Sequence, residues 1–330
     1  MDEGTRAGAP AAAVERLRVL AYEIPVDGPE GRESDGTLEW DSTTCIVVLA
    51  SAGGQTGMGY TYGDVAVARM IDSKLAGAAL GTDALTPPAT WHSMFAQLRN
   101  AGRPGAGAMA VSAVDIALWD LRARLLGRPL YQTLPAFHDQ VPVYGSGGFT
   151  NYPLDRLACQ LAWGRHFRDE FGVTWLEEPV SSEDVEGLAL LRAAGPPGLD
   201  IAAGEYGFLL SDFGRLLDAG AVDCLQADVT RCGGITGLLQ AAGLAAARQT
   251  DLSAHCAPAV SAHAFCAVER LRHLEYFHDH VRVEAMLFDG AQAPVAGALR
   301  PDPSTPGLGL ELRTADAAEF QVHHSDHPRR

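Results

Sequence analysis

The sequence predicts an α/β protein in which an α+β domain is followed by repeated strand–helix units. Mixed strand-like and helical patterns fill residues 14–135, and apolar strand-like runs alternate with helical stretches over 136–284. Such alternation is typical of a parallel sheet, either open or closed into a barrel. We therefore expect two domains over these ranges, preceded by a disordered leader at 1–13.

The first domain begins with β-structure. The segment VERLRVLAYEIPV alternates as a strand does, and TTCIVVLASAGGQTGMGYTY predicts a hairpin that turns at Ala52, Gly53 and Gly54. Between these segments, the polar and Gly-rich loop at 27–42 is long enough to act as a lid. Helices are then expected at about 64–75, about 88–99 and 107–127, the last ending at Gly127.

Six strand-like runs follow in the second domain: VPVYGS, GVTWLEEP, LDIAAGE, AVDCLQADV, TDLSAHC and LRHLEYF. In parallel α/β folds the residues at the carboxyl ends of the strands carry the chemistry. Polar residues suited to chemistry stand at these ends: Glu177, Glu178, Glu205, Asp228, His255 and Glu275.

These residue types fit a metal-assisted acid–base site. Glu177 and Glu205 come from neighbouring strands and suit a hard divalent cation such as Mg²⁺. Asp228 and His255 follow on the next two strands, where a carboxylate orients an imidazole and raises its pKa. Glu275 could hydrogen-bond a substrate as an acid.

Each of these residues also has a simpler interpretation. A strand-end glutamate such as Glu205 is often a solvated loop residue, and a single histidine such as His255 is often only a satisfied polar group. Cys256 is expected to serve packing. The ordered series on successive strand ends favours a site, because all members would converge on one mouth of the sheet.

Composition narrows the possible partners and the compartment. The formal net charge of −16 argues against nucleic acid and against an anionic membrane surface, although a bound metal ion would still permit an anionic substrate. Six scattered cysteines without a CxxC pair indicate reduced thiols in a cytoplasmic protein and do not have the spacing of a zinc site. No apolar run of about 18 residues and no signal-peptide pattern is present.

Five segments carry one further pattern: AVSAVDIALWDLRARLLGRPL, TWLEEP, AAGE, QADVTRCGGITG and SAHCAP. Together they resemble the mandelate racemase group of the enolase superfamily, and the likeness covers about 14–314. The resemblance implies an α+β capping domain, a TIM-like (β/α) barrel, Mg²⁺, and abstraction of the proton α to a carboxylate. It also implies that 285–330 returns to the capping domain and ends in a polar tail.

The resemblance also implies roles for single residues. Glu177 and Glu205 match metal ligands, Asp228 and His255 match the acid–base dyad, and Glu275 matches the acid that hydrogen-bonds the substrate carboxylate. The loop at 27–42 matches the specificity loop, so Glu39 or Trp40 is expected to contact substrate. Glu178 and Arg231 are expected to contact the metal-binding and catalytic residues and orient them, although a surface or packing role fits Arg231 equally well.

The chain departs from the family pattern in the second and third barrel strands. The family has lysines on the second strand and an aspartate metal ligand on the third, whereas Lys74 is the only lysine here and lies in the first domain. Asp155 and Asp169 are the nearest acids before Glu177, but both lie in a stretch whose pattern predicts a helix. With about six strands we expect an incomplete barrel, from which an internal deletion removed two units.

These features give two functional hypotheses. The first is a Mg²⁺-dependent enzyme acting on a hydroxy acid or sugar acid, most simply by dehydration, since one histidine dyad remains without the opposite lysine. The second is a catalytically impaired member that at most binds a carboxylate or serves a structural role. Exposed strand edges also lead us to expect a homo-oligomer.

Overall fold

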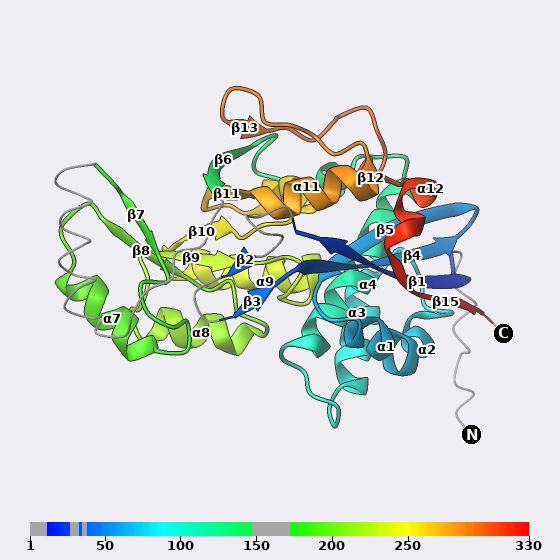
Figure 1. Ribbon diagram of the computed structural model, residues 1–330, viewed down its shortest axis with the longest axis horizontal. Helices are drawn as coiled ribbons and strands as arrows, with labels where there is room; N and C mark the ends of the chain where they lie inside the picture. Colours follow the sequence, from blue (N-terminus) through cyan, green and yellow to red (C-terminus); the bar gives the residue numbers. More distant parts are fainter. Residues whose placement is uncertain (1–11, 27–32, 35–37, 147–171, 330) are drawn as a thin grey trace, which may run out of the picture.

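The structure is a computed structural model, and it describes residues 12–26, 33–34, 38–146 and 172–329 (Figure 1). Its described part contains one four-stranded sheet and one seven-stranded sheet, each with its own helices. The expected α/β class, with a capping domain beside an incomplete barrel, is confirmed. None of the helices in these ranges is long and apolar enough to cross a membrane.

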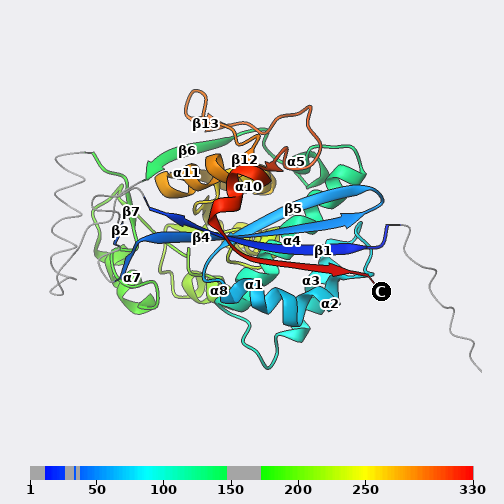
Figure 2. The ribbon, with the colours of Figure 1, turned by 45° about the vertical axis from the view of Figure 1, so that its right-hand side comes forward.

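The capping sheet is antiparallel and has the order β15-β1-β4-β5. Its β4–β5 turn uses Gly53 and Gly54, whose φ angles of 56° and 75° suit glycine, so the expected hairpin is confirmed. The C-terminal strand β15 lies along β1, which Figure 2 shows as red beside blue. The strands are β1 (Arg16–Pro25), β4 (Ser42–Ala52), β5 (Gln55–Tyr62) and β15 (Gln321–Pro328).

Helices pack on this sheet, and their core is apolar. The helix expected at 64–75 instead continues to Ala79 and contains a π-helical turn. The helix expected over 107–127 spans Ala106–Leu125, and Gly127 follows its C-terminus with a φ of 64°. The bounds are α1 (Ala66–Met70), η2 (Ile71–Leu75), α2 (Ala76–Ala79), α3 (Pro87–Gln97), α4 (Ala106–Leu125) and α5 (Leu130–Thr133).

Helix α4 is buried along almost its whole length because it packs against both the capping sheet and α9 (Gly234–Ala247) of the barrel. Two glycines of β5 allow its close approach. A Cβ atom on Gly57 would lie 2.2 Å from the Leu121 nitrogen, and one on Gly59 would lie 2.3 Å from the Ala113 carbonyl oxygen. Larger residues there would push α4 off the sheet.

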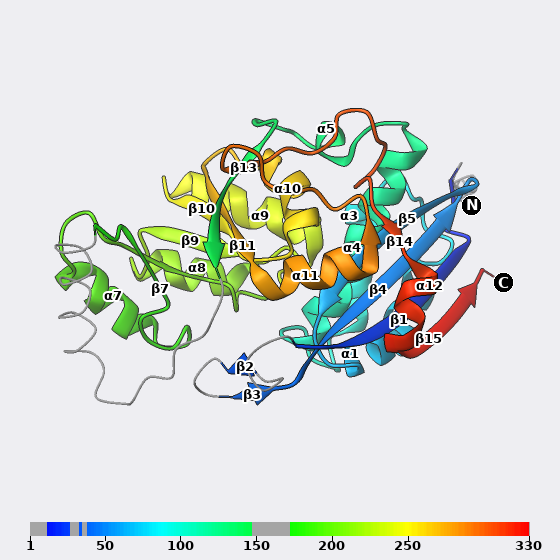
Figure 3. The same cartoon turned by 45° about the horizontal axis from the view of Figure 1, so that its top comes forward.

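The second sheet has the order β13-β6-β11-β10-β9-β8-β7, and all neighbours are parallel except β13 and β6. All six expected strands are confirmed. The first of them, β6, pairs with the last, β11, as in a closed barrel, and among the described residues the sheet ends at β7 on one side and β13 on the other (Figure 3). The strands are β6 (Val141–Ser146), β7 (Trp175–Glu177), β8 (Asp200–Ala203), β9 (Cys224–Ala227), β10 (Asp251–Ala254), β11 (Leu271–Phe277) and β13 (Ala298–Leu299).

Helices follow the barrel strands, and short elements connect the barrel to β15. A separate ribbon is formed by β2 (Glu33–Ser34) and β3 (Glu39–Trp40). The remaining bounds are α7 (Val185–Ala194), α8 (Leu210–Asp218), α10 (Pro258–Ala264), η3 (Phe265–Ala267), α11 (His278–Leu287), β12 (Phe288–Asp289), β14 (Glu311–Leu312), α12 (Thr314–Ala317) and η4 (Ala318–Phe320).

At the N-terminus, residues 1–11 of the expected leader lie outside the described ranges. Ala13 forms an isolated bridge with Asp83, and the Ala12 carbonyl accepts a hydrogen bond of 2.9 Å from the Ala84 nitrogen. Contacts with the capping domain therefore begin at Ala12, two residues before the expected domain start at Val14.

Candidate active site

Adjacent parallel strands deliver the candidate residues to one edge of the sheet. Strands β7, β8, β9, β10 and β11 are consecutive neighbours, so their carboxyl ends lie side by side. Glu275 lies on β11 itself, and the other candidates stand at or just after the ends of the four other strands: Glu177, Glu178, Glu205, Asp228 and His255.

His255 is the centre of the cluster. Its Nδ1 atom lies 2.7 Å from Asp228 Oδ2, and its Nε2 atom lies 3.4 Å from Glu205 Oε2 and 3.5 Å from Glu275 Oε2. Three members of the cluster are buried: Asp228 is 0% exposed, His255 7% and Glu275 6%. A buried imidazole is thus held between carboxylates on both of its nitrogens.

The charges around His255 decide its protonation. Burial acts to lower its pKa, but Glu205, the hydrogen bond to Asp228, and Glu275 together raise the pKa to about 10. Burial acts to raise the pKa of Asp228, but the hydrogen bond and ion pair with His255 outweigh it and hold that pKa below the usual value. Near neutral pH the pair is therefore an imidazolium and a carboxylate.

Asp228 is fixed by further partners. Its Oδ1 atom accepts hydrogen bonds of 2.6 Å from both the nitrogen and the Oγ1 of Thr230. Arg231 Nε lies 3.5 Å from Asp228 Oδ2, and a second Arg231 nitrogen lies 3.3 Å from Glu205 Oε1. The capping domain reaches this loop as well, since Thr61 Oγ1 donates to the Thr230 carbonyl at 2.7 Å.

Glu177 accepts three hydrogen bonds from inside the sheet. Tyr144 Oη and Trp175 Nε1 donate to Oε2 at 2.9 and 3.1 Å, and Gln226 Nε2 donates to Oε1 at 2.7 Å. An ionised carboxylate offers about four acceptor sites, so the described residues leave one site of Glu177 unfilled. These donors were not anticipated, although Tyr144 and Gln226 are polar residues in otherwise apolar strands and could have been found by that signal.

Glu178 is turned away from the regular strand. Its φ of 39° is in the left-handed region, and its Oε1 atom is buried without a hydrogen-bond partner among the described residues. Burial, followed by the charge of Glu205, raises the pKa of Glu178 to about 8. Burial, followed by the charges of Glu275 and Glu205, also raises the pKa of Glu177.

The donor chemistry of this edge fits a hard divalent cation. Two glutamate carboxyl groups have pKa values raised by burial and by neighbouring glutamates, and one of their buried oxygens has no hydrogen-bond partner among the described residues. A bound cation would offset both effects. Neither Glu177 nor Glu205 belongs to a group of three ligand atoms that all lie within 4.8 Å of one another in the described ranges. The residues that could hold the cation are Glu177, Glu178 and Glu205.

Several expected participants are placed elsewhere or not described. Glu39 and Trp40 lie on β3, where they pair with Ser34 and Glu33 of β2. Their contact with substrate stays a prediction. The aspartate ligand of the family's third barrel strand has no assigned counterpart, since Asp155 and Asp169 lie outside the described residues.

Family models match both parts of the chain. Residues 34–134 match the "Mandelate racemase / muconate lactonizing enzyme, N-terminal domain", and residues 155–317 match the "Enolase C-terminal domain-like" model. A solved mandelate racemase/muconate lactonizing enzyme-like protein from Rubrobacter xylanophilus is 53% identical. It aligns over 94% of this chain and 100% of its own, with a TM-score of 0.89.

Two further relatives carry more specific names. A racemase from Streptomyces coelicolor, solved with bound magnesium, is 27% identical over 94% of this chain and 100% of its own, with a TM-score of 0.82. The L-talarate/galactarate dehydratase of Salmonella typhimurium is 28% identical over 74% of this chain and 76% of its own length.

Proposed function

The chain belongs to the mandelate racemase/muconate lactonizing enzyme family, and on this premise we propose that it is a Mg²⁺-dependent enzyme. Its reaction is removal of the proton α to the carboxylate of a hydroxy acid or sugar acid, leading to dehydration. The observation that carries this proposal is the buried pair of His255 and Asp228, with Glu275 3.5 Å from the second imidazole nitrogen, Nε2. The dehydratase among its relatives and the magnesium-bound racemase structure support it.

His255 is the proposed acid–base group. Its Nδ1 atom donates to Asp228, so Nε2 is left as the atom that exchanges a proton with substrate. With a pKa of about 10, His255 carries a proton near neutral pH and can deliver it to a leaving hydroxyl. Neutralising the charge of Glu205 would remove one cause of the raised pKa and let His255 accept the α-proton.

Glu177 and Glu205 are the proposed Mg²⁺ ligands, and Glu178 is proposed to contact and orient them. When bound, Mg²⁺ supplies positive charge beside the substrate carboxylate and stabilises the negative charge that develops there. Glu275 is proposed to hydrogen-bond the same carboxylate, and Arg231 holds Glu205 and Asp228 in place through its two nitrogens. Glu39 and Trp40 are proposed to contact the rest of the substrate.

The test is exchange of the α-proton for deuterium, followed by NMR with a panel of aldarates and aldonates in deuterium oxide and excess Mg²⁺. The wild type is expected to exchange at least one of them, and His255→Asn is expected to lose about 10²-fold or more of the rate. His92→Asn, an exposed histidine on α3, is the matched control and should leave the rate unchanged. Exchange that survives in His255→Asn would overturn the assignment.

One observation favours the second candidate function, a catalytically impaired carboxylate-binding or structural protein. Glu205 is already paired with Arg231 at 3.3 Å and with His255 at 3.4 Å, so part of the charge that a cation would neutralise is neutralised within the chain. This candidate predicts a folded protein that neither exchanges α-protons nor gives a heat of Mg²⁺ binding. Micromolar Mg²⁺ binding that disappears in Glu205→Gln would exclude it.

A further inference from the structure

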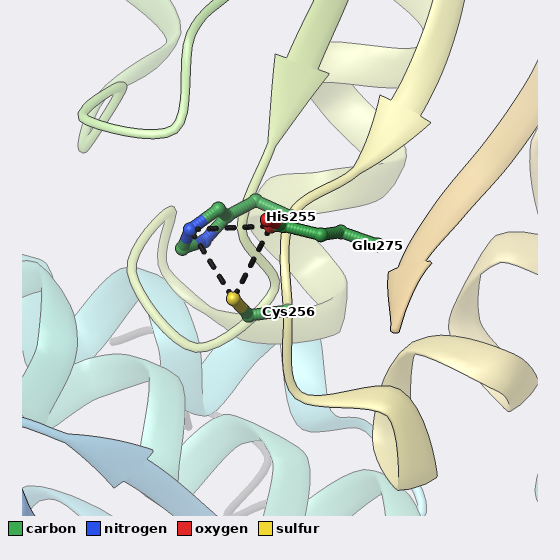
Figure 4. A group of neighbouring side chains, drawn as sticks. All are labelled: His255, Cys256 and Glu275. Atoms are coloured by element: carbon green, nitrogen blue, oxygen red, sulfur yellow. Dashed lines mark hydrogen bonds and ion pairs between the residues drawn. The ribbon is translucent and has the colours of Figure 1, made fainter. Parts of the chain in front are cut away.

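His255, Cys256 and Glu275 form a compact group that the proposed reaction does not explain (Figure 4). Among the described residues it is the only group of three or more His, Cys, Asp or Glu side chains whose ligand atoms all lie within 4.8 Å of one another. Cys256 Sγ lies 3.3 Å from His255 Nε2 and 3.3 Å from Glu275 Oε2, and these two atoms are 3.5 Å apart. All three residues are buried.

These separations match the edges of a tetrahedral zinc site. Zinc binds sulfur at about 2.3 Å and nitrogen or oxygen at about 2.0–2.2 Å, so tetrahedral ligand atoms stand roughly 3.3–3.6 Å apart. The observed triangle therefore needs little movement to receive the ion. Its donor set also discriminates between metals, since a thiolate and an imidazole favour zinc over Mg²⁺, which prefers oxygen ligands.

The backbone brings neighbouring residues to the same point. Along a regular strand, adjacent side chains face opposite sides, so His255 and Cys256 would diverge. Here Cys256 and Ala257 both have left-handed φ angles, of 48° and 45°, and the chain turns back so that the thiol faces the imidazole. Non-glycine residues adopt such angles at a cost in free energy, and strain of this kind collects at functional sites.

We propose that His255 Nε2, Cys256 Sγ and a Glu275 oxygen form a binding site for zinc or a similar soft divalent ion, with the fourth position open. Binding releases two protons to solvent, one from the Cys256 thiol and one from Nε2 of the His255 imidazolium, and it occupies the imidazole nitrogen that the proposed reaction requires. Zinc is therefore an inhibitor that competes for the acid–base group rather than a replacement for Mg²⁺. Binding itself is independent of the proposed function, and only the inhibition rests on it.

Cobalt titration tests the site, because a thiolate bound to Co²⁺ gives an intense charge-transfer absorption that oxygen ligands do not give. In excess Mg²⁺, the full-length wild type should develop this band at one Co²⁺ per chain and lose it when Zn²⁺ is added. Cys256→Ser should abolish the band. Cys266→Ser is the matched control, because Cys266 is also buried and its hydrogen bond to the Ala262 carbonyl suits a hydroxyl.

Two further measurements distinguish failure of the zinc site from failure of the proposed function. Glu275→Gln should retain the band but weaken Co²⁺ binding by more than about 10-fold, the lower end of the loss seen for partners outside the coordination shell. If the wild type exchanges α-protons, zinc should inhibit the exchange and Cys256→Ser should resist it. No band in the wild type, or an unchanged band in folded Cys256→Ser, would overturn the site even if the exchange activity exists. A band without exchange would keep the site and reject the proposed function.

Discussion

Glu284 shows, at the scale of one residue, how burial makes stability depend on pH. It lies on α11 with 2% exposure, and its carboxylate accepts hydrogen bonds from Tyr60 Oη and the Ala259 nitrogen. Burial raises its pKa to about 8, against the opposing effect of these bonds. The groups that face it are titratable as well, namely Tyr60, Tyr62 and Cys45, with His280 stacked on Tyr62.

The sign of the effect follows from proton binding. Between about pH 4.5 and 8 the folded state holds the Glu284 proton and the unfolded state has lost it, so stability falls as pH rises. We expect the free energy of unfolding of the wild type, measured relative to Glu284→Gln, to fall by roughly 1.4 kcal/mol per pH unit between pH 5 and 7. Urea titrations measure it, with exposed Glu319→Gln as a control that should follow the wild type. A constant difference across this range would contradict the prediction.

At the scale of elements, the start of α9 is capped by another helix. Ser112 Oγ on α4 accepts hydrogen bonds of 2.9 Å from the nitrogens of both Gly233 and Gly234, and Asp115 accepts from Thr236 at 2.9 Å. Gly234 has a φ of 78°, and a Cβ atom there would lie 2.5 Å from Asp115 Oδ2. The capping domain therefore supplies the N-terminal cap of a barrel helix.

Ser112→Ala tests this cap. It leaves two buried N–H groups without an acceptor, so we expect a loss of about 2–4 kcal/mol in the free energy of unfolding. Ser304→Ala also loses a hydrogen bond, to Asp302, but at an exposed site, and should cost less than about 0.5 kcal/mol. Equal effects of the two substitutions in denaturant titrations would show that the α4–α9 contact is not a cap.

At the scale of the whole molecule, local patterns predicted elements well and long-range partners poorly. The six barrel strands and the β4–β5 hairpin follow from alternation and glycine position, which act over a few residues. The order of the candidate residues along the sheet edge follows from the order of the strands in the chain, because neighbouring parallel strands place their carboxyl ends side by side. The donors to Glu177, the turn that aims Cys256 at His255, and the π-helical turn in 64–79 depend on contacts between distant segments and left only weak signals.

The two domains are joined at several buried points. The barrel is bonded to the cap through Tyr60 and Glu284, through Thr61 and Thr230, and through α4. The chain then leaves the barrel and places β15 beside β1, where His323 and His327 contact Asp72 of η2 at 3.0 and 2.9 Å. Cap and barrel should therefore unfold together.

Deletion of the chain from Gln321 onward tests that cooperativity. Removing β15 leaves one edge of β1 unpaired and Asp72 without both histidines, so we expect a single calorimetric transition lowered by roughly 5–10 °C, equivalent to a few kcal/mol. The exposed β1 edge should also increase association of the shortened chain in size-exclusion chromatography. Val322→Thr, at a half-exposed position of β15, preserves the strand and should unfold within about 2 °C of the wild type. A separate early transition for the capping domain in the shortened chain would show that the buried contacts do not couple the two domains.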